Sequence, residues 1–201
     1  MTELTGLCRL LAEYTPYNEQ EARDRDAMIE FISSASVDPY TRENEVAHLT
    51  ASAWIVNRER TKVLMVYHNL YDSWSWTGGH ADGERDLLFV ALKEAREETG
   101  VEHIRPITED IFSVECLTVD GHEKRGKYVP SHIHMNVTYL LEADERDTLH
   151  ICEGENSGVK WFTLDEALKA SSEPWFVERI YKKLNMKLDE FIRRENEAKT
   201  R

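Results

Sequence analysis

The chain has 201 residues, of which 41% are hydrophobic, enough for one core and a small appendage. Its net charge of −13 means that most of the surface would repel a phosphate backbone, which argues against an extended nucleic-acid partner. Its three cysteines are widely spaced, and the amino terminus has no long apolar run, so we expect neither disulfides nor a zinc motif, signal peptide or membrane span. These features together predict a cytoplasmic protein.

Residues 1–35 have the apolar spacing of two helices, interrupted near Pro16. Their apolar stripes contain Leu4, Leu7, Leu10 and Leu11, then Met28, Ile29 and Ile32. Two short helices cannot hide these side chains alone, so we expect them to pack on the domain's own surface or on a second copy of the chain, which would make a homodimer. We therefore divide the chain into a helical extension, 1–40, and a main domain, 41–201.

The main domain alternates strand-like and helical segments. Extended segments are predicted at His48–Val56, Val63–His68, Trp74–Trp76, Phe112–Val119, His132–Leu141 and Val159–Thr163. A long loop is expected from Asp120 to Ser131, and helices from Asp86 to Gly100, from Asp165, and from about Pro174 to Ala198. This order predicts a mixed fold of helices and strands, α/β in the broad sense and α+β in the stricter one.

The helix before Gly100 carries an unusual group of acids. At about 100° per residue, Glu94, Glu97 and Glu98 fall within an arc of roughly 100°. Leu87 and Val90 continue the same stripe one to two turns earlier, so the carboxylates should point into the protein. The negative end of the helix dipole disfavours anions there, which suggests that a cation is bound.

Three carboxylates without a nearby cysteine suit a hard ion, Mg²⁺ or Mn²⁺, whose remaining positions water and substrate phosphates fill. Such an ion neutralises a diphosphate and lowers the pKa of a bound water, so that hydroxide can attack phosphorus. The simpler interpretation is an ordinary charged helix end.

The segment around this helix resembles the Nudix box. The box is written as G, five residues, E, seven residues, then R-E-U-x-E-E-x-G-U, where U is aliphatic. Here Gly79 stands first, and the run from Lys93 to Val101, KEAREETGV, stands last. Two positions depart from the pattern, because the early glutamate is Glu84, one residue too soon, and Lys93 replaces the arginine. In the family that pair braces the loop, and lysine lacks arginine's two-pronged contact.

The resemblance covers roughly residues 46–170 and implies a mixed sheet sandwiched between helices. It also implies that Glu94, Glu97, Glu98 and the carbonyl of Gly79 hold the metal, and that the substrate is a small diphosphate linked to another group, typically a nucleoside diphosphate. Two alternatives stay open. One is a Nudix-like domain that binds a nucleotide or sugar diphosphate without hydrolysis; the other is an isopentenyl-diphosphate isomerase, whose chemistry needs a cysteine near the metal.

Three further groups are candidates for substrate contact. His134 belongs to a polar row on one strand face, which could line a cleft or be an ordinary half-solvated face. Lys124 and Arg125 are central in a basic stretch that could bind phosphate or be a solvated loop tip. Glu155 precedes a turn signal and could act as the general base from outside the box, as in some Nudix enzymes.

Overall fold

The computed structural model describes residues 6–124 and 126–200, and it divides into two compact units. The first unit comprises the described residues up to Ala53 with Gly78–Ala95 and Pro106–Leu141. The second comprises Trp54–Thr77, Arg96–Arg105 and the described residues from Glu142 onward.

The first unit begins with the two predicted helices, α1 (Gly6–Glu13) and α2 (Glu19–Ser34). Asn18 caps α2 by accepting a hydrogen bond from the Glu21 N–H, which explains why this helix starts where it does. Leu7, Leu11, Met28 and Ile32 are buried, whereas Leu4 lies outside the described residues.

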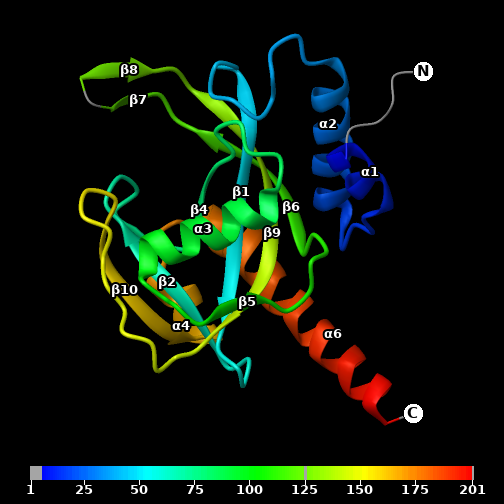
Figure 1. Cartoon of the computed structure of the whole chain (residues 1–201), viewed down its shortest axis with the longest axis vertical. Coiled ribbons are helices and arrows are strands. Elements are labelled where there is room, and N and C mark those ends of the chain that lie inside the picture. Colours follow the sequence, from blue (N-terminus) through cyan, green and yellow to red (C-terminus); the bar gives the residue numbers. More distant parts are fainter. Residues whose placement is uncertain (1–5, 125, 201) are drawn as a thin grey trace. The chain divides into compact units, whose positions relative to one another are not determined.

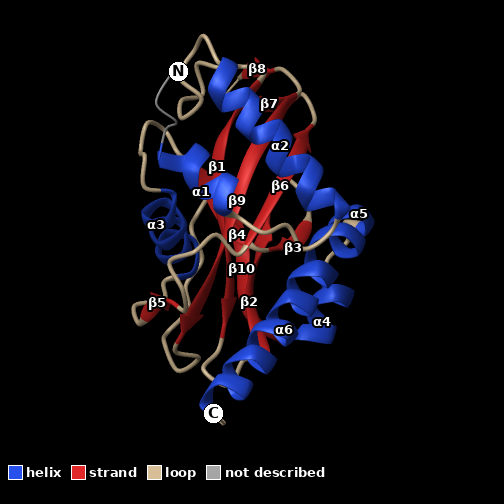
Figure 2. Cartoon of the chain, turned by 90° about the vertical axis from the view of Figure 1, so that its right-hand side faces the viewer, coloured by secondary structure: helices blue, strands red, loops and turns tan. Residues whose placement is uncertain are grey.

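Helix α2 packs on strand β6 (Ser113–Val119), and α1 packs on α2, as both ribbon views show (Figures 1 and 2). The contact is polar as well as apolar. The Ser113 hydroxyl donates to the buried Glu21 carboxylate at 2.8 Å, and Tyr14 donates to the same carboxylate at 2.5 Å. The amino-terminal helices are thus covered by their own chain along this face.

The strands of the first unit follow one another as β4 (Thr77–His80), β1 (Ala47–Val56), β9 (His132–Ala143) and β6. Strand β1 is buried along its whole length, with Leu49 and Ala51 alternating with His48, Thr50 and Ser52. Two members of the polar row are satisfied internally, because the Asn136 side-chain oxygen accepts from Thr50 at 3.0 Å and Ser52 at 2.9 Å.

One sequence expectation is wrong in this unit. The segment from Asp120 to Ser131 is not a structureless loop, because β7 (His122–Lys124) pairs antiparallel with β8 (Lys127–Val129). The apolar alternation that predicts a half-buried strand is missing there, since an exposed hairpin needs none.

The second unit is built on β2 (Lys62–His68), which pairs antiparallel with β10 (Asn156–Thr163), β3 (Ser73–Ser75) and the end of β1. Helix α4 (Leu164–Ala170) packs on β10, β2 and β3, and Thr163 and Glu166 form its capping box. The predicted final helix is continuous from 174 to 199, as α5 (Pro174–Phe176), a π-helical turn (Val177–Tyr181) and α6 (Lys182–Lys199). Strand β5 (Ile104–Pro106) was not predicted.

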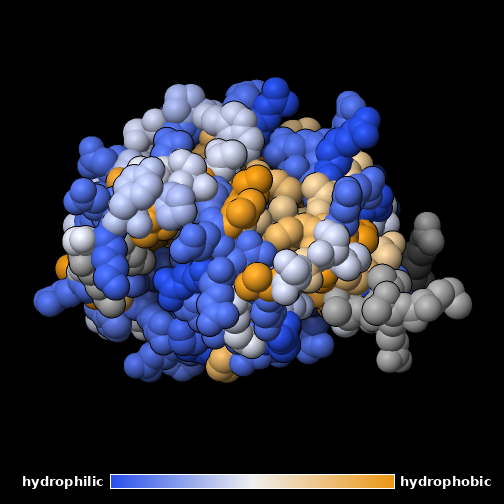
Figure 3. Space-filling view, turned by 90° about the horizontal axis from the view of Figure 1, so that it is seen from above, coloured by the Kyte–Doolittle hydropathy of each residue, from blue (hydrophilic) through white to orange (hydrophobic). Residues whose placement is uncertain are grey.

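Aromatic side chains form much of the second unit's core. Trp54 stacks on Tyr181 with ring centroids 5.5 Å apart, and Trp76 meets the Tyr181 ring edge-on at 5.9 Å. Trp76 is 7% exposed, so its role is structural. In the space-filling view, most of the visible surface is hydrophilic, and an apolar area lies within the same face (Figure 3).

Candidate active site

Helix α3 (Leu87–Thr99) starts and ends at the residues expected from the sequence. The Asp86 carboxylate accepts the Phe89 N–H at 3.0 Å, which makes Asp86 the N-cap. Gly100 has φ +77°, the left-handed conformation that ends a helix and that glycine adopts without strain. The acidic run is therefore held at the last turn and a half of a well-defined helix.

The three glutamates of α3 differ in exposure. Glu94 is half-buried, Glu97 is exposed and Glu98 is 7% exposed. A carboxylate buried to this extent is taken out of bulk water, which is costly for a charged group. The low exposure of Glu98 is therefore compatible with a cation bound beside it.

Gly79 and Glu94 lie against each other within the first unit. A Cβ on Gly79 would lie 2.7 Å from the Glu94 carboxylate oxygen Oε2 and 2.8 Å from its Cγ, so only glycine permits this approach. The carboxylate is also paired with its neighbour Lys93, whose Nζ is 3.1 Å from Oε1. A hard divalent cation takes oxygen donors such as carboxylates and main-chain carbonyls, and residues 79 and 94 can supply one of each.

The early glutamate, one of the two departures from the box, has its own local contacts. Glu84 Oε1 accepts the backbone N–H groups of Arg85 at 2.7 Å and Asp86 at 2.9 Å, and these hydrogen bonds lower the pKa of Glu84. Arg85 pairs with Asp38 at 2.5 Å, and its guanidinium lies 4.2 Å from the centre of the Tyr40 ring. The loop before α3 is therefore fixed by these contacts of Glu84 and Arg85.

In the second unit, Glu155 lies near the end of α3. Asn156 donates from its side-chain nitrogen to the Glu98 carbonyl at 2.9 Å, which ties the start of β10 to the helix. The Cys152 thiol donates to Glu155 at 3.6 Å. Burial raises the pKa of Cys152, and the charges of Glu155, Glu98 and Glu97 raise it further.

His134 is placed in a cluster of four histidines in the first unit. It joins His132 on β9, His48 on β1 and His80 on β4, and ligand atoms of all four lie within 4.8 Å of one another. Burial, followed by the neighbouring imidazoles, lowers the pKa of His134 to about 2. His48 and His80 were not singled out by sequence, because only strand pairing brings them to His134.

The basic stretch is described only in part. Lys124 ends β7, where its backbone pairs with Lys127, and Arg125 lies outside the described residues. Their assignment to phosphate binding stays a prediction.

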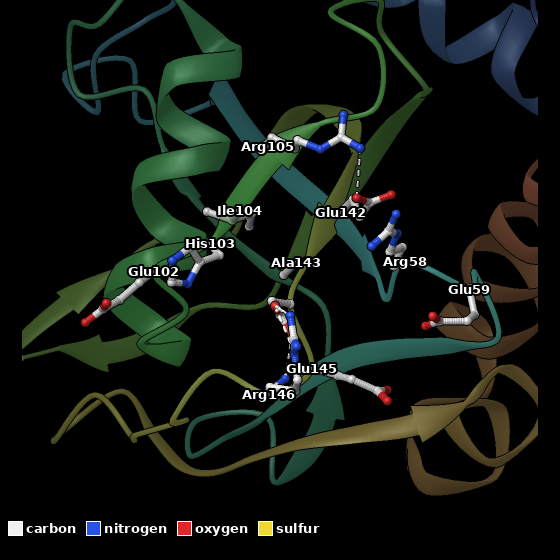
Figure 4. A pocket seen from close by; sticks show the side chains of 11 residues that line it. Arg58, Glu59, Glu102, His103, Ile104, Arg105, Glu142, Ala143, Glu145 and Arg146 are labelled. Carbon is white, nitrogen blue, oxygen red and sulfur yellow. Dashed lines mark hydrogen bonds and ion pairs between the residues drawn. The ribbon is translucent and has the colours of Figure 1, made fainter.

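A hollow in the second unit also contains basic side chains, from Arg58, Arg105 and Arg146 (Figure 4). Five acids line it as well, namely Glu59, Glu102, Glu142, Asp144 and Glu145. Arg105 pairs with Glu142 at 2.8 Å, and Arg146 pairs with Asp144 at 2.5 Å. With this excess of acid, the hollow does not suit a phosphorylated ligand.

Comparison with known proteins agrees with the residues of the box. A family model described as the NUDIX domain matches residues 46–184. The chain belongs to the Nudix family.

A Rattus norvegicus protein, bis(5'-nucleosyl)-tetraphosphatase (asymmetrical), is 31% identical over 96 residues, which are 47% of this chain and 58% of that relative. The matched part thus spans little more than half of the relative's length. A solved structure of a C. elegans Ap4A hydrolase binary complex has a TM-score of 0.50 at 21% identity and covers 72% of this chain and 96% of that chain. This likeness confirms the α+β fold expected from the sequence. Within the described residues, no helix combines the length and the apolar character needed to cross a membrane.

Proposed function

We propose that this chain is a metal-dependent pyrophosphohydrolase that cleaves a diphosphate linkage in a nucleoside diphosphate joined to another group. The observation that carries the proposal is the intact acidic run of α3, with Glu98 7% exposed and Gly79 open to the Glu94 carboxylate. A binding domain without hydrolysis would have no need to keep all three acids.

The donor set fits Mg²⁺ or Mn²⁺. Glu94, Glu97, Glu98 and the Gly79 carbonyl supply only oxygen atoms, and a Cβ at position 79 would occupy the space beside Glu94. When bound there, the ion would neutralise the diphosphate and lower the pKa of an attacking water.

The chain's own residues would then supply the proton transfer. Glu155 and Glu97 are exposed, so the carboxylate of either can contact water. The charges of both also raise the pKa of the Cys152 thiol. We assign Glu155 as the general base and Glu97 as a ligand, because general bases of this family can come from outside the box. The Asn156 contact to the Glu98 carbonyl would hold the Glu155 loop in place.

The name of the rat relative supports one substrate class for this proposal. We propose a dinucleoside tetraphosphate, split unequally into a nucleoside triphosphate and a nucleoside monophosphate. Substrate phosphates would be contacted from the basic stretch that contains Lys124 and Arg125.

The test is a panel of dinucleoside polyphosphates, sugar nucleotides and isopentenyl diphosphate, each incubated with purified protein and Mg²⁺. We expect nucleoside triphosphate and monophosphate products from a dinucleoside tetraphosphate. Turnover should be about a hundredfold lower in both Glu97→Gln and Glu98→Gln. The matched control is Glu102→Gln, an exposed acid just beyond the helix, which should keep turnover within about twofold. Binding without turnover would favour the regulatory alternative, and isomerised isopentenyl diphosphate would favour the isomerase.

A further inference from the structure

The four histidines of the first unit form a compact group at the point where three strands adjoin. Strand β4 lies beside β1 and β1 lies beside β9, so His80, His48 and the pair His132 and His134 converge. The rings are 4.8–5.1 Å apart between centroids for His48–His80, His48–His132, His48–His134, His80–His134 and His132–His134. His48 and His132 are buried, and His80 and His134 are half-buried.

Two of these imidazoles are already oriented as metal ligands. His48 Nδ1 lies 3.1 Å from the Asn44 carbonyl oxygen, and His132 Nδ1 lies 2.8 Å from the Pro130 carbonyl oxygen. A carbonyl oxygen only accepts, so in both rings Nδ1 carries the proton and Nε2 holds the free electron pair. A backbone carbonyl on the far nitrogen is the usual outer contact of a metal-bound histidine.

The Nε2 atom of His48 is buried and has no hydrogen-bond partner. A polar atom left unsatisfied in the interior keeps the full cost of losing its water, so such atoms are uncommon in folded proteins. This atom belongs to a ring that faces the other three histidines. This unsatisfied atom points to a bound ligand independently of the convergence of the four rings.

The spacing also suits a small cation. His132 Nε2 and His134 Nε2 are 3.1 Å apart. In a tetrahedral site with metal–nitrogen bonds of about 2.0–2.1 Å, neighbouring nitrogens are about 3.3 Å apart. This pair thus already has the separation needed, and the wider pairs, up to 4.8 Å, have to close by small side-chain rotations.

We propose that His48, His80, His132 and His134 form a second metal site, which binds Zn²⁺ in preference to Mg²⁺ and is separate from the carboxylates of α3. Four neutral imidazoles suit borderline transition-metal ions, whereas Mg²⁺ requires oxygen ligands. Binding would exchange the hydrogen bond between His132 and His134 for two metal–nitrogen bonds, with the His134 proton moving to its Nδ1. The ion would join β1, β4 and β9, and so would stabilise the strand that carries Gly79.

The experiment uses the 201-residue chain without a histidine tag, stripped with chelator and kept in millimolar Mg²⁺, which competes with Zn²⁺ for the carboxylates of α3. Zn²⁺ is titrated against a competing chelator, and Co²⁺ is added separately because its visible absorption reports tetrahedral nitrogen ligation. We expect one Zn²⁺ per chain, a tetrahedral cobalt spectrum and a higher melting temperature with Zn²⁺.

Variants separate this site from the proposed active site. His80→Gln and His134→Gln, both at half-buried positions, should weaken Zn²⁺ binding by about a hundredfold, with folding checked by circular dichroism. The control is His122→Gln, whose ring is 6.4 Å from His132 but which lies outside the cluster. Glu98→Gln should leave Zn²⁺ binding unchanged. Failure of the untagged wild type to bind Zn²⁺, or equal binding in folded His134→Gln, overturns the proposal, whether or not the protein hydrolyses a diphosphate.

Discussion

Replacing Gly79 with alanine should remove activity while the fold survives. The new Cβ would lie 2.7 Å from Glu94 Oε2, whereas ordinary contacts begin at 3.4 Å, and the carboxyl carbon would be closer still. The clashing atoms are at the end of a flexible side chain, so the Glu94 carboxylate can move away by about 1 Å while the backbone stays in place. Such a displacement of a catalytic group lowers the rate by about a hundredfold.

Gly78→Ala is the matched comparison. There the Cβ would meet the Ala51 carbonyl oxygen at 2.8 Å and the Ser52 Cα at 2.9 Å, and backbone cannot swing aside. We expect it to cost about 1–3 kcal/mol, which lowers the melting temperature by roughly 2–12 °C.

The assay for both variants is turnover on the best substrate, measured beside a thermal melt in Mg²⁺-free buffer. Gly79→Ala should keep its melting temperature within about 2 °C and lose activity. The reasoning is refuted if Gly79→Ala keeps more than a tenth of the wild-type turnover, or if it loses as much stability as Gly78→Ala.

Three further outcomes are expected. Millimolar Mg²⁺ should raise the melting temperature of chelator-stripped protein by roughly 5–11 °C at about a hundred times Kd, and a Glu97→Gln/Glu98→Gln double variant should not respond. Equal responses would argue against the carboxylate site. Burial alone would raise the pKa of Asp147. Hydrogen bonds from the backbone and the ring of His103 and from the backbone of Glu102 instead hold the pKa of Asp147 below 3.8. The Asp147 carboxylate in turn raises the pKa of His103 above 6.5. The contribution of Asp147 to the free energy of unfolding is lost as pH falls below 3.8, and that of His103 is lost as pH rises above 6.5. Asp147→Asn should therefore destabilise the protein most between these two pH values. A loss of stability that does not depend on pH would contradict this. Deleting residues 1–36 uncovers β6 and should lower the melting temperature or cause aggregation; an unchanged melt and oligomeric state would show that the helices are not part of the core.

The acidic helix could be read from the sequence because its signals are local. Asp86, the three glutamates and Gly100 lie within 15 residues, and capping, periodicity and the left-handed glycine each act within one or two turns. The family followed from the same segment.

The histidine cluster could not be read in this way. His48 and His80 are 32 residues apart, and both are far in sequence from His132. Which strands adjoin, and in which register, depends on pairing across the whole first unit, and no local pattern encodes it. For the same reason the contact between Gly79 and Glu94 was expected from resemblance but not from spacing.

The central claim is that water attacks phosphorus at the carboxylates of α3, and oxygen-18 water tests it most directly. A dinucleoside tetraphosphate is hydrolysed in labelled water with Mg²⁺, and the masses of the products are measured by mass spectrometry. The account predicts one labelled oxygen in a phosphate group of a single product, with label incorporation reduced about a hundredfold in Glu98→Gln. Unlabelled products, or equal labelling by Glu98→Gln, would contradict it.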